Sequence, residues 1–170
     1  FLTGYKQGAA YIDPQTKVLV SFAGTFNDPL KGKELTLAQY SQGADIVMNV
    51  ASNTGNGILE AAKDSKKYAI GVDINQDDIY PGFILTSMLK RVDVATYNMI
   101  KQVYEGNFKG GEIVRMDASN GGVGLTDMAA MKTALKDKFP EDILAKINEL
   151  TEKIKKGEIK VESYPGFKVE

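Results

Sequence analysis

The sequence contains no histidine and no cysteine among its 170 residues. Without these two residue types, the usual ligands of zinc, copper and haem sites are missing. The same absence excludes Ser-His-Asp and Cys-His nucleophilic catalysis, which leaves carboxylate-based or lysine-based chemistry as the remaining route to an enzyme. We therefore expect neither a metal nor a cofactor.

Charge of one sign and long apolar runs are also scarce. The formal net charge is −1, so no basic surplus points to nucleic acid as a partner. No run of about 18 apolar residues is present, so no segment is predicted to span a membrane. An apolar content of 43% is ordinary for a globular protein, and the length suits one domain, or one domain with a fragment of another.

Apolar segments that predict strands alternate with amphipathic segments that predict helices. The expected strands are residues 17–23, 45–51, 68–72, 82–85, 111–115 and 158–162. The expected helices are residues 1–11, 28–43, 56–65, 87–104, 127–138 and 140–156. This alternation favours an α/β fold, with a parallel sheet flanked by helices. Because the first helix has no cap before it, we expect that the chain begins inside a domain.

Short polar loops follow three of the expected strands. Residues 18–22 lead into 23–28, residues 45–51 into 52–57, and residues 68–72 into 73–77. In open α/β sheets, ligands bind in the crevice beyond the carboxyl ends of the strands. The three loops together therefore predict one small-molecule site.

Two side chains in these loops suit a planar ligand with hydroxyl groups. Phe26 lies in the loop after its strand, where an aromatic ring can stack on a base; the alternative is that it covers the top of the core. Asp73 directly follows an apolar strand, where its carboxylate can accept two hydrogen bonds, as from a ribose; the alternative is that it caps the next turn.

A glycine loop and a lysine are weaker candidates. Thr54-Gly55-Asn56-Gly57 opens a helix, but a third glycine is absent and Glu60 adds negative charge, so a neutral ligand bound by the backbone is favoured over a phosphate. Lys90 is expected in the first turn of the 87–104 helix, where a cation opposes the helix dipole. It either pairs with Asp73, donates to a ligand, or is surface charge.

The carboxylates Asp73, Asp77 and Asp78 are close in sequence, and a close pair can divide acid and base roles. However, the sequence offers no nucleophile or electrophile beside them. We therefore expect that the protein is not an enzyme, and keep as an alternative a nucleotide- or sugar-acting α/β enzyme that uses these carboxylates.

Several segments in order resemble the basic membrane protein family, the nucleoside-binding lipoproteins of bacterial ABC importers. The segments are Val-Leu-Val-Ser-Phe-Ala-Gly-Thr-Phe-Asn-Asp-Pro from Val18, Gly-Ala-Asp-Ile-Val from Gly43, Thr-Gly-Asn-Gly from Thr54, Ile-Gly-Val-Asp from Ile70, and Thr-Ser-Met-Leu-Lys-Arg-Val-Asp from Thr86. The resemblance extends from Gly4 to Asp127.

The resemblance implies a type I periplasmic-binding-protein fold, in which two α/β lobes close on a purine nucleoside. It implies that Phe26 contacts the base, that Asp73 holds the ribose, that Lys90 is the basic residue and that Gly55 contributes a backbone contact. It further implies an ABC importer permease as partner, and an extracytoplasmic, membrane-anchored lipoprotein as the full-length protein.

The family's first lobe, its lipid-bearing cysteine and the first strand of its second lobe have no counterpart here. We therefore expect residues 1–86 to be a second-lobe segment incomplete at its N-terminus, residues 87–127 a crossover helix with hinge segments, and residues 128–170 C-terminal helices and a strand. A regulatory sensor domain of the same fold is a further alternative.

Overall fold

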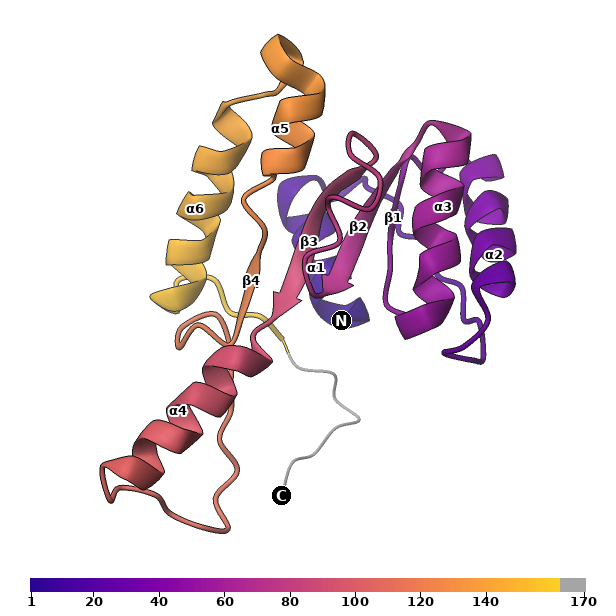
Figure 1. Ribbon diagram of the computed structural model, residues 1–170. Coiled ribbons are helices and arrows are strands. Elements are labelled where there is room, and N and C mark those ends of the chain that lie inside the picture. The colour runs from indigo at the N-terminus through magenta and orange to yellow at the C-terminus, as the bar shows by residue number, and fades with distance from the viewer. Residues whose placement is uncertain (163–170) are drawn as a thin grey trace.

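The computed structural model describes residues 1–162, in which a four-stranded sheet carries helices on both faces (Figure 1). The strand order is β1-β2-β3-β4. Strands β1 (Ile46–Met48), β2 (Tyr68–Asp73) and β3 (Ile84–Lys90) are parallel, and β4 (Val123–Leu125) pairs antiparallel with β3. The expected α/β class is confirmed, with an antiparallel fourth strand that the sequence did not predict.

The helices follow the predicted order. They are α1 (Leu2–Ile12), α2 (Pro29–Ser41), α3 (Gly55–Ser65), α4 (Val92–Tyr104), α5 (Ala129–Leu135) and α6 (Asp142–Lys155), with short 3₁₀ turns at Ser52–Thr54 and Lys136–Lys138. The start of α2 is as predicted, because the Asp28 side chain accepts a hydrogen bond from the Lys31 N–H at 3.0 Å and Pro29 occupies the first turn. Gly43 follows the end of α2 at a φ of +99°, which glycine adopts without strain.

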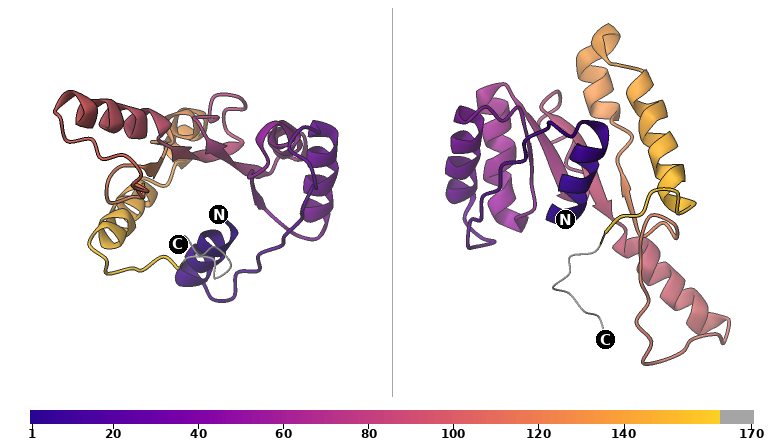
Figure 2. Two further views of the ribbon diagram at one scale, coloured as in Figure 1. Left: turned by 90° about the horizontal axis from the view of Figure 1, so that it is seen from below. Right: turned by 180° about the vertical axis from the view of Figure 1, so that it is seen from behind.

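The main core lies between α3 and the sheet. Its fully buried members include Leu59 on α3, Ala69 on β2 and Ile84 on β3. The backbones of α2 and α3 approach each other closely at Gly57, where an added Cβ would overlap the carbonyl of Pro29. A second cluster, of Met128, Met131 and Phe139 with neighbours on α6, packs near β3 through Leu85. Helix α1 lies on the opposite face of the sheet from α3 (Figure 2).

The strand predicted at residues 17–23 is wrong. This segment is extended, but within residues 1–162 its backbone makes no hydrogen bond, and Phe22 is 82% exposed. A strand exists only where a neighbour supplies the ladder, and here a cavity separates the segment from β1. The strand predicted at 45–51 is shorter in the structure, because only the residues of β1 pair with β2.

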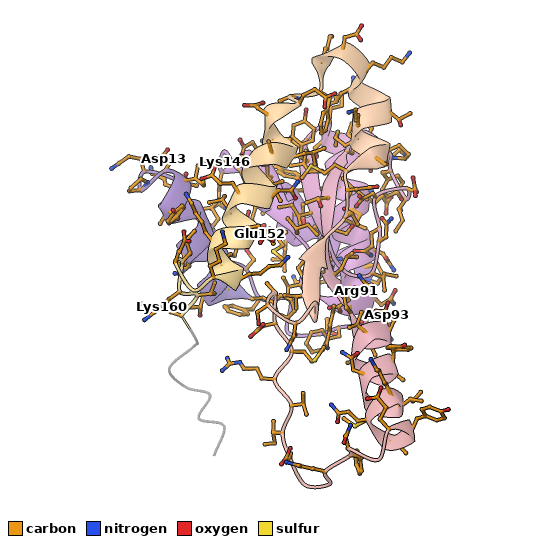
Figure 3. The ribbon with its side chains drawn as sticks, turned by 90° about the vertical axis from the view of Figure 1, so that its left-hand side faces the viewer. Asp13, Arg91, Asp93, Lys146, Glu152 and Lys160 are labelled. Atoms are coloured by element: carbon orange, nitrogen blue, oxygen red, sulfur yellow. The ribbon has the colours of Figure 1, made fainter. Side chains whose placement is uncertain are left out.

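Two further predicted strands are also wrong, at residues 111–115 and 158–162. Ile113 and Val114 are exposed in the long loop after α4, and the carbonyl of Arg115 accepts a hydrogen bond from the Asn120 amide instead of from a strand. Around Lys160, which Figure 3 labels, the side chain of Gln7 on α1 replaces a strand partner: its amide donates to the Lys160 carbonyl at 2.6 Å and accepts from the Glu162 N–H at 2.9 Å.

The boundary between β3 and α4 differs from the prediction. We expected a strand at 82–85 and a helix from 87, whereas β3 continues to Lys90 and α4 begins at Val92. The pairing of Ser87 with Gly71 and of Leu89 with Asp73 extends the strand. Arg91 then turns the chain and its guanidinium binds the Asp93 carboxylate at 2.8 Å (Figure 3). This hydrogen bond holds the pKa of Asp93 at about 2.

Helix α4 and the loop after it extend away from the sheet (Figure 1). None of the residues of α4 is buried, although Val92, Tyr97, Ile100, Val103 and Tyr104 are large and apolar or aromatic. Among the described helices, none is long and apolar enough to traverse a bilayer.

Candidate functional site

The first two polar loops meet at the carboxyl edge, by which we mean the carboxyl ends of β1, β2 and β3 with the loops around them. The Thr54 N–H donates to the carbonyl of Phe26 at 3.1 Å. The buried Thr54 hydroxyl donates to the Thr25 carbonyl at 3.1 Å and accepts from the Asp28 N–H at 2.9 Å. The loop that carries Phe26 is therefore fixed to the loop after β1, although no strand precedes it.

Buried amides connect the second loop to the third. Asn49 follows β1, is fully buried, and donates from its amide nitrogen to the Gln76 side-chain oxygen at 3.3 Å. The same oxygen accepts the Val72 N–H of β2 at 2.9 Å. On the other side, the Ser87 hydroxyl of β3 accepts the Gln76 N–H at 3.0 Å. All three parallel strands are thus joined by one polar network.

Phe26 is 71% exposed at this edge. The alternative in which its ring covers the core is therefore wrong, because a ring in that role would be buried. Its backbone carbonyl is held by Thr54, so the side chain projects from an anchored loop. An exposed aromatic ring on a fixed support is the arrangement that stacking on a planar ligand requires.

Asp73 ends β2 in an unusual backbone conformation. Its φ is +69°, and the Ile74 N–H donates to the Val72 carbonyl at 2.9 Å, so that Asp73 is the central residue of a tight γ-turn. Non-glycine residues adopt positive φ at a cost, and such strain concentrates at functional sites. The Asp73 carboxylate is exposed and accepts no hydrogen bond from residues 1–162, so the alternative in which it caps a turn is not supported.

Lys90 lies at the carboxyl end of β3, not in the first turn of a helix as predicted. Its neighbour Leu89 pairs in register with Asp73, which places Lys90 at the same edge as the aspartate. Within the described part of the chain, neither Asp73 nor Lys90 takes part in an ion pair. The pairing that the sequence suggested is absent there, and both charged groups face solvent.

Gly55 has a structural reason to be glycine. It is buried, and a Cβ on it would overlap the side-chain amide of Asn49. Its N–H closes the 3₁₀ turn by donating to Ser52 and Asn53 carbonyls. Gly55 therefore lets Asn49 reach Gln76, and a direct backbone contact with a ligand remains a prediction.

The three carboxylates considered for catalysis do not share one environment. Asp77 is 2% exposed and accepts the Ser87 hydroxyl at 2.5 Å, whereas Asp73 and Asp78 are exposed. No group of three or more potential metal-binding side chains occurs among residues 1–162. Asp77 is thus part of the buried network beneath the edge.

Sequence reasoning missed Asn49, Gln76 and Ser87, which hold this edge together. A signal was available for one of them, since Asn49 is a polar residue among the apolar residues of the segment predicted as a strand at 45–51. Asn49 and Ser87 bind Gln76, which is 27 and 11 residues away along the chain, respectively, so only the fold identifies the network.

A cavity of about 820 Å³ lies next to the carboxyl edge, between residues 17–26 and β1. Its lining comes from α1, α2, β1 and the residues after β1, and it includes Phe26 and Thr54. The cavity is lined largely by apolar side chains.

Comparisons with known proteins agree on one family. A family model described as ABC transporter substrate-binding protein PnrA-like matches residues 1–164. An uncharacterized lipoprotein of Pyrococcus horikoshii is 34% identical, over 94% of this chain and 48% of its own length. The ABC transporter nucleoside-binding protein BmpA of Lactococcus lactis is 34% identical, over 74% of this chain and 40% of its own length.

A solved structure shows the same relation. The solute-binding protein of an ABC transporter system from Aeropyrum pernix superimposes with a TM-score of 0.73 at 31% identity, over 96% of this chain and 54% of that one. The chain thus spans about half the length of the curated relatives it matches.

Proposed function

Because the chain belongs to the PnrA-like family of ABC transporter substrate-binding proteins, we propose that it is part of a receptor that binds a purine nucleoside for import. The observation that carries the proposal is the carboxyl edge. There an exposed aromatic ring (Phe26), a carboxylate without a partner among residues 1–162 (Asp73) and a lysine outside any ion pair of that range (Lys90) share one hydrogen-bonded support.

Each group has a role that matches part of a nucleoside. The Phe26 ring stacks on the purine, an interaction worth about 1–3 kcal/mol. The Asp73 carboxylate accepts hydrogen bonds from the two ribose hydroxyls, and the γ-turn directs it away from the sheet. Lys90 donates to a polar atom of the ligand, and Gly55 supports the site through Asn49 and by a backbone contact. No step requires a covalent bond to change, so the protein binds without catalysis.

A second lobe supplies the other wall of the site in this proposal. Helix α4 exposes the apolar side of Tyr97, Ile100 and Val103, which a lobe packed there would cover. We propose that residues 1–86 belong to the second lobe, that 87–127 form the crossover and that 128–170 complete the C-terminal part, although β3 continues to Lys90 and residues 163–170 lie outside the described range. Ligand binding then closes the two lobes.

The family supports a proposal for the place of action. A substrate-binding protein delivers its ligand to the permease of an ABC importer, and relatives such as the one from Pyrococcus horikoshii are named lipoproteins. We place the full-length protein outside the cytoplasm, anchored to the membrane by lipid.

Calorimetry on the full-length protein tests this function. Adenosine or guanosine is expected to release heat in a one-to-one titration, whereas free ribose and the free base bind more weakly because each makes half of the contacts. If no purine nucleoside gives heat, the nucleoside assignment is wrong. Turnover of a bound nucleoside, detected by chromatography, would contradict the non-catalytic role.

A further inference from the structure

The polar loop after β2 is tied back to the sheet by one residue, Gln76. Gln76 is 8% exposed, and its side-chain oxygen accepts two hydrogen bonds, from the Val72 N–H at 2.9 Å and from the Asn49 amide at 3.3 Å. Its backbone N–H donates to the Ser87 hydroxyl at 3.0 Å. A single loop residue therefore binds β2, β3 and the residue that follows β1.

The Gln76 oxygen takes the place of a strand carbonyl. Where β1 ends, the Asn49 N–H donates to the Ile70 carbonyl of β2 at 2.9 Å. The bonds of a parallel ladder are evenly spaced, so the next one would run from the Val72 N–H back to the Asn49 carbonyl. The Val72 N–H binds the Gln76 side chain instead. The loop thus supplies the last hydrogen bond on the β1 side of β2.

Asp73 lies between the two points at which this loop is held. Val72 is held at the end of β2, and only residues 73–75 separate it from Gln76. A chain that returns to its own strand over so few residues needs a tight turn, which the γ-turn at Asp73 and its φ of +69° provide. A strained conformation persists where the surrounding structure determines it. The hydrogen bonds of Gln76 are the contacts that do so here.

The directions of these hydrogen bonds are fixed by the groups that make them. A backbone N–H can only donate, so the oxygen of the Gln76 amide, and not its nitrogen, faces Val72. The Ser87 hydroxyl uses its one hydrogen on the buried Asp77 carboxylate at 2.5 Å, and it therefore accepts from the Gln76 N–H. A Cβ on Gly71 would overlap this hydroxyl, so the loop and β3 meet closely over β2.

We propose that Gln76 is a positioning residue of the nucleoside site: its side chain holds Asp73 in the γ-turn and so directs the carboxylate toward the ribose hydroxyls. The inference rests on the proposed function and adds to it a residue that acts through Asp73. Loss of the Gln76 amide then weakens recognition of the ribose and leaves stacking on the base intact. The two are separable because Phe26 is anchored in another loop, through Thr54.

Calorimetry on the full-length protein with two ligands tests this role. The ligands are the tighter-binding of adenosine and guanosine, and its 2′,3′-dideoxy analogue, which lacks both ribose hydroxyls. Gln76→Met keeps the length of the side chain and removes its oxygen. The variant is expected to weaken binding of the ribonucleoside about tenfold or more, the size of a lost hydrogen bond to a charged group. Binding of the dideoxynucleoside is expected to stay nearly unchanged. Equal losses for both ligands, or no loss for either, overturn the proposal.

Combination with Asp73→Ala shows whether Gln76 acts through Asp73. Adding Gln76→Met to Asp73→Ala is expected to cause no further loss of ribonucleoside affinity, since the carboxylate to be positioned is already gone. A further loss as large as that of Gln76→Met alone overturns the positioning role.

Thr36→Val is the matched control for loss of a buried hydrogen bond. Thr36 is 1% exposed, and within residues 1–162 its hydroxyl binds only the Gly32 carbonyl of its own helix. This variant is expected to leave the ratio of the two affinities unchanged. If it alters the ratio as much as Gln76→Met does, the ratio reports stability, and the proposal is wrong.

The unchanged protein separates failure of this inference from failure of the proposed function. If it binds the ribonucleoside no more tightly than the dideoxynucleoside, the proposed role of Asp73 is wrong, and the positioning role is wrong with it. If it prefers the ribonucleoside and Gln76→Met keeps that preference, only the positioning role is wrong.

Hydrogen exchange of the ligand-free, full-length protein provides a measurement that needs no variant to fold. The Val72 amide is expected to exchange as slowly as the amides in the middle of β2, because its bond to Gln76 exists before the ligand binds. Rapid exchange that slows only when a nucleoside is added would mean that the ligand orders the loop, which overturns the proposal.

Discussion

Replacing Asp73 by glycine is predicted to stabilise the fold while it removes ligand binding. A φ of +69° costs a non-glycine residue roughly 1–2 kcal/mol, and aspartate lies at the lower end of this range. The Asp73 carboxylate contacts no partner within residues 1–162, so its removal loses no interaction there. Glycine loses more backbone entropy on folding, which offsets about 0.4–1 kcal/mol. We therefore expect Asp73→Gly to raise the free energy of unfolding by about 0.5 kcal/mol.

Asp73→Ala is the matched control for this substitution. Both variants lack the carboxylate, but alanine keeps the Cβ that disfavours positive φ, so Asp73→Gly is expected to exceed Asp73→Ala in stability by roughly 1 kcal/mol. Urea unfolding compares the two variants through the midpoint at equal slope. In thermal unfolding, the same difference corresponds to about 2–4 °C for a chain of this size.

Two results would refute the reasoning separately. If Asp73→Ala is as stable as Asp73→Gly, the γ-turn stores no strain at residue 73. If either variant binds purine nucleosides like the unchanged protein, the carboxylate is outside the site, whatever the stability shows. If Asp73→Gly is the more stable variant and both variants lose nucleoside binding, the strained backbone at Asp73 is explained by the need for its carboxylate in the binding site.

Four further substitutions separate binding from folding. Phe26→Ala is expected to weaken nucleoside binding by about 1–3 kcal/mol with little change in stability, because the ring is exposed; calorimetry with unchanged affinity would contradict stacking. Asp73→Asn is expected to weaken binding of nucleosides more than of free bases, and equal losses in calorimetry would indicate a general folding defect. Gly57→Ala is expected to destabilise the fold by about 2 kcal/mol or more, since the new Cβ would overlap the Pro29 carbonyl, whereas Gly8→Ala, with open space around it, is expected to stabilise α1 by roughly 0.5–1 kcal/mol in urea unfolding.

Helices were predictable because their signals are local. The cap at Asp28, the proline in the first turn and the glycine after Ser41 fixed α2, and each acts within a few residues of its own position. Strands were less predictable because every ladder hydrogen bond of a strand needs a neighbouring strand, which can lie far away along the chain. The 17–23 segment has the composition of a strand and lacks the ladder that would make it one within residues 1–162.

The boundary at Lys90 shows the same dependence on partners. Residues 87–90 have a helical apolar spacing when read together with 92–103, but pairing of Ser87 and Leu89 with β2 keeps them in the sheet. That correction moved Lys90 from a helix to the carboxyl end of β3, and its role in binding a ligand stays a prediction. The position of the candidate lysine was therefore decided by strand pairing.

The sequence by itself determined the class of fold, the three polar loops and the types of side chain that they present. These properties follow from composition and spacing along the chain, and the resemblance to a family rests on five short segments in order. The tertiary structure alone decided that Asn49, Gln76 and Ser87 join those loops, that Asp73 takes a strained conformation, and that a cavity of about 820 Å³ lies beside β1. Contacts between residues far apart in sequence create the buried network and the cavity, and the backbone conformation of Asp73 is visible only in the folded chain.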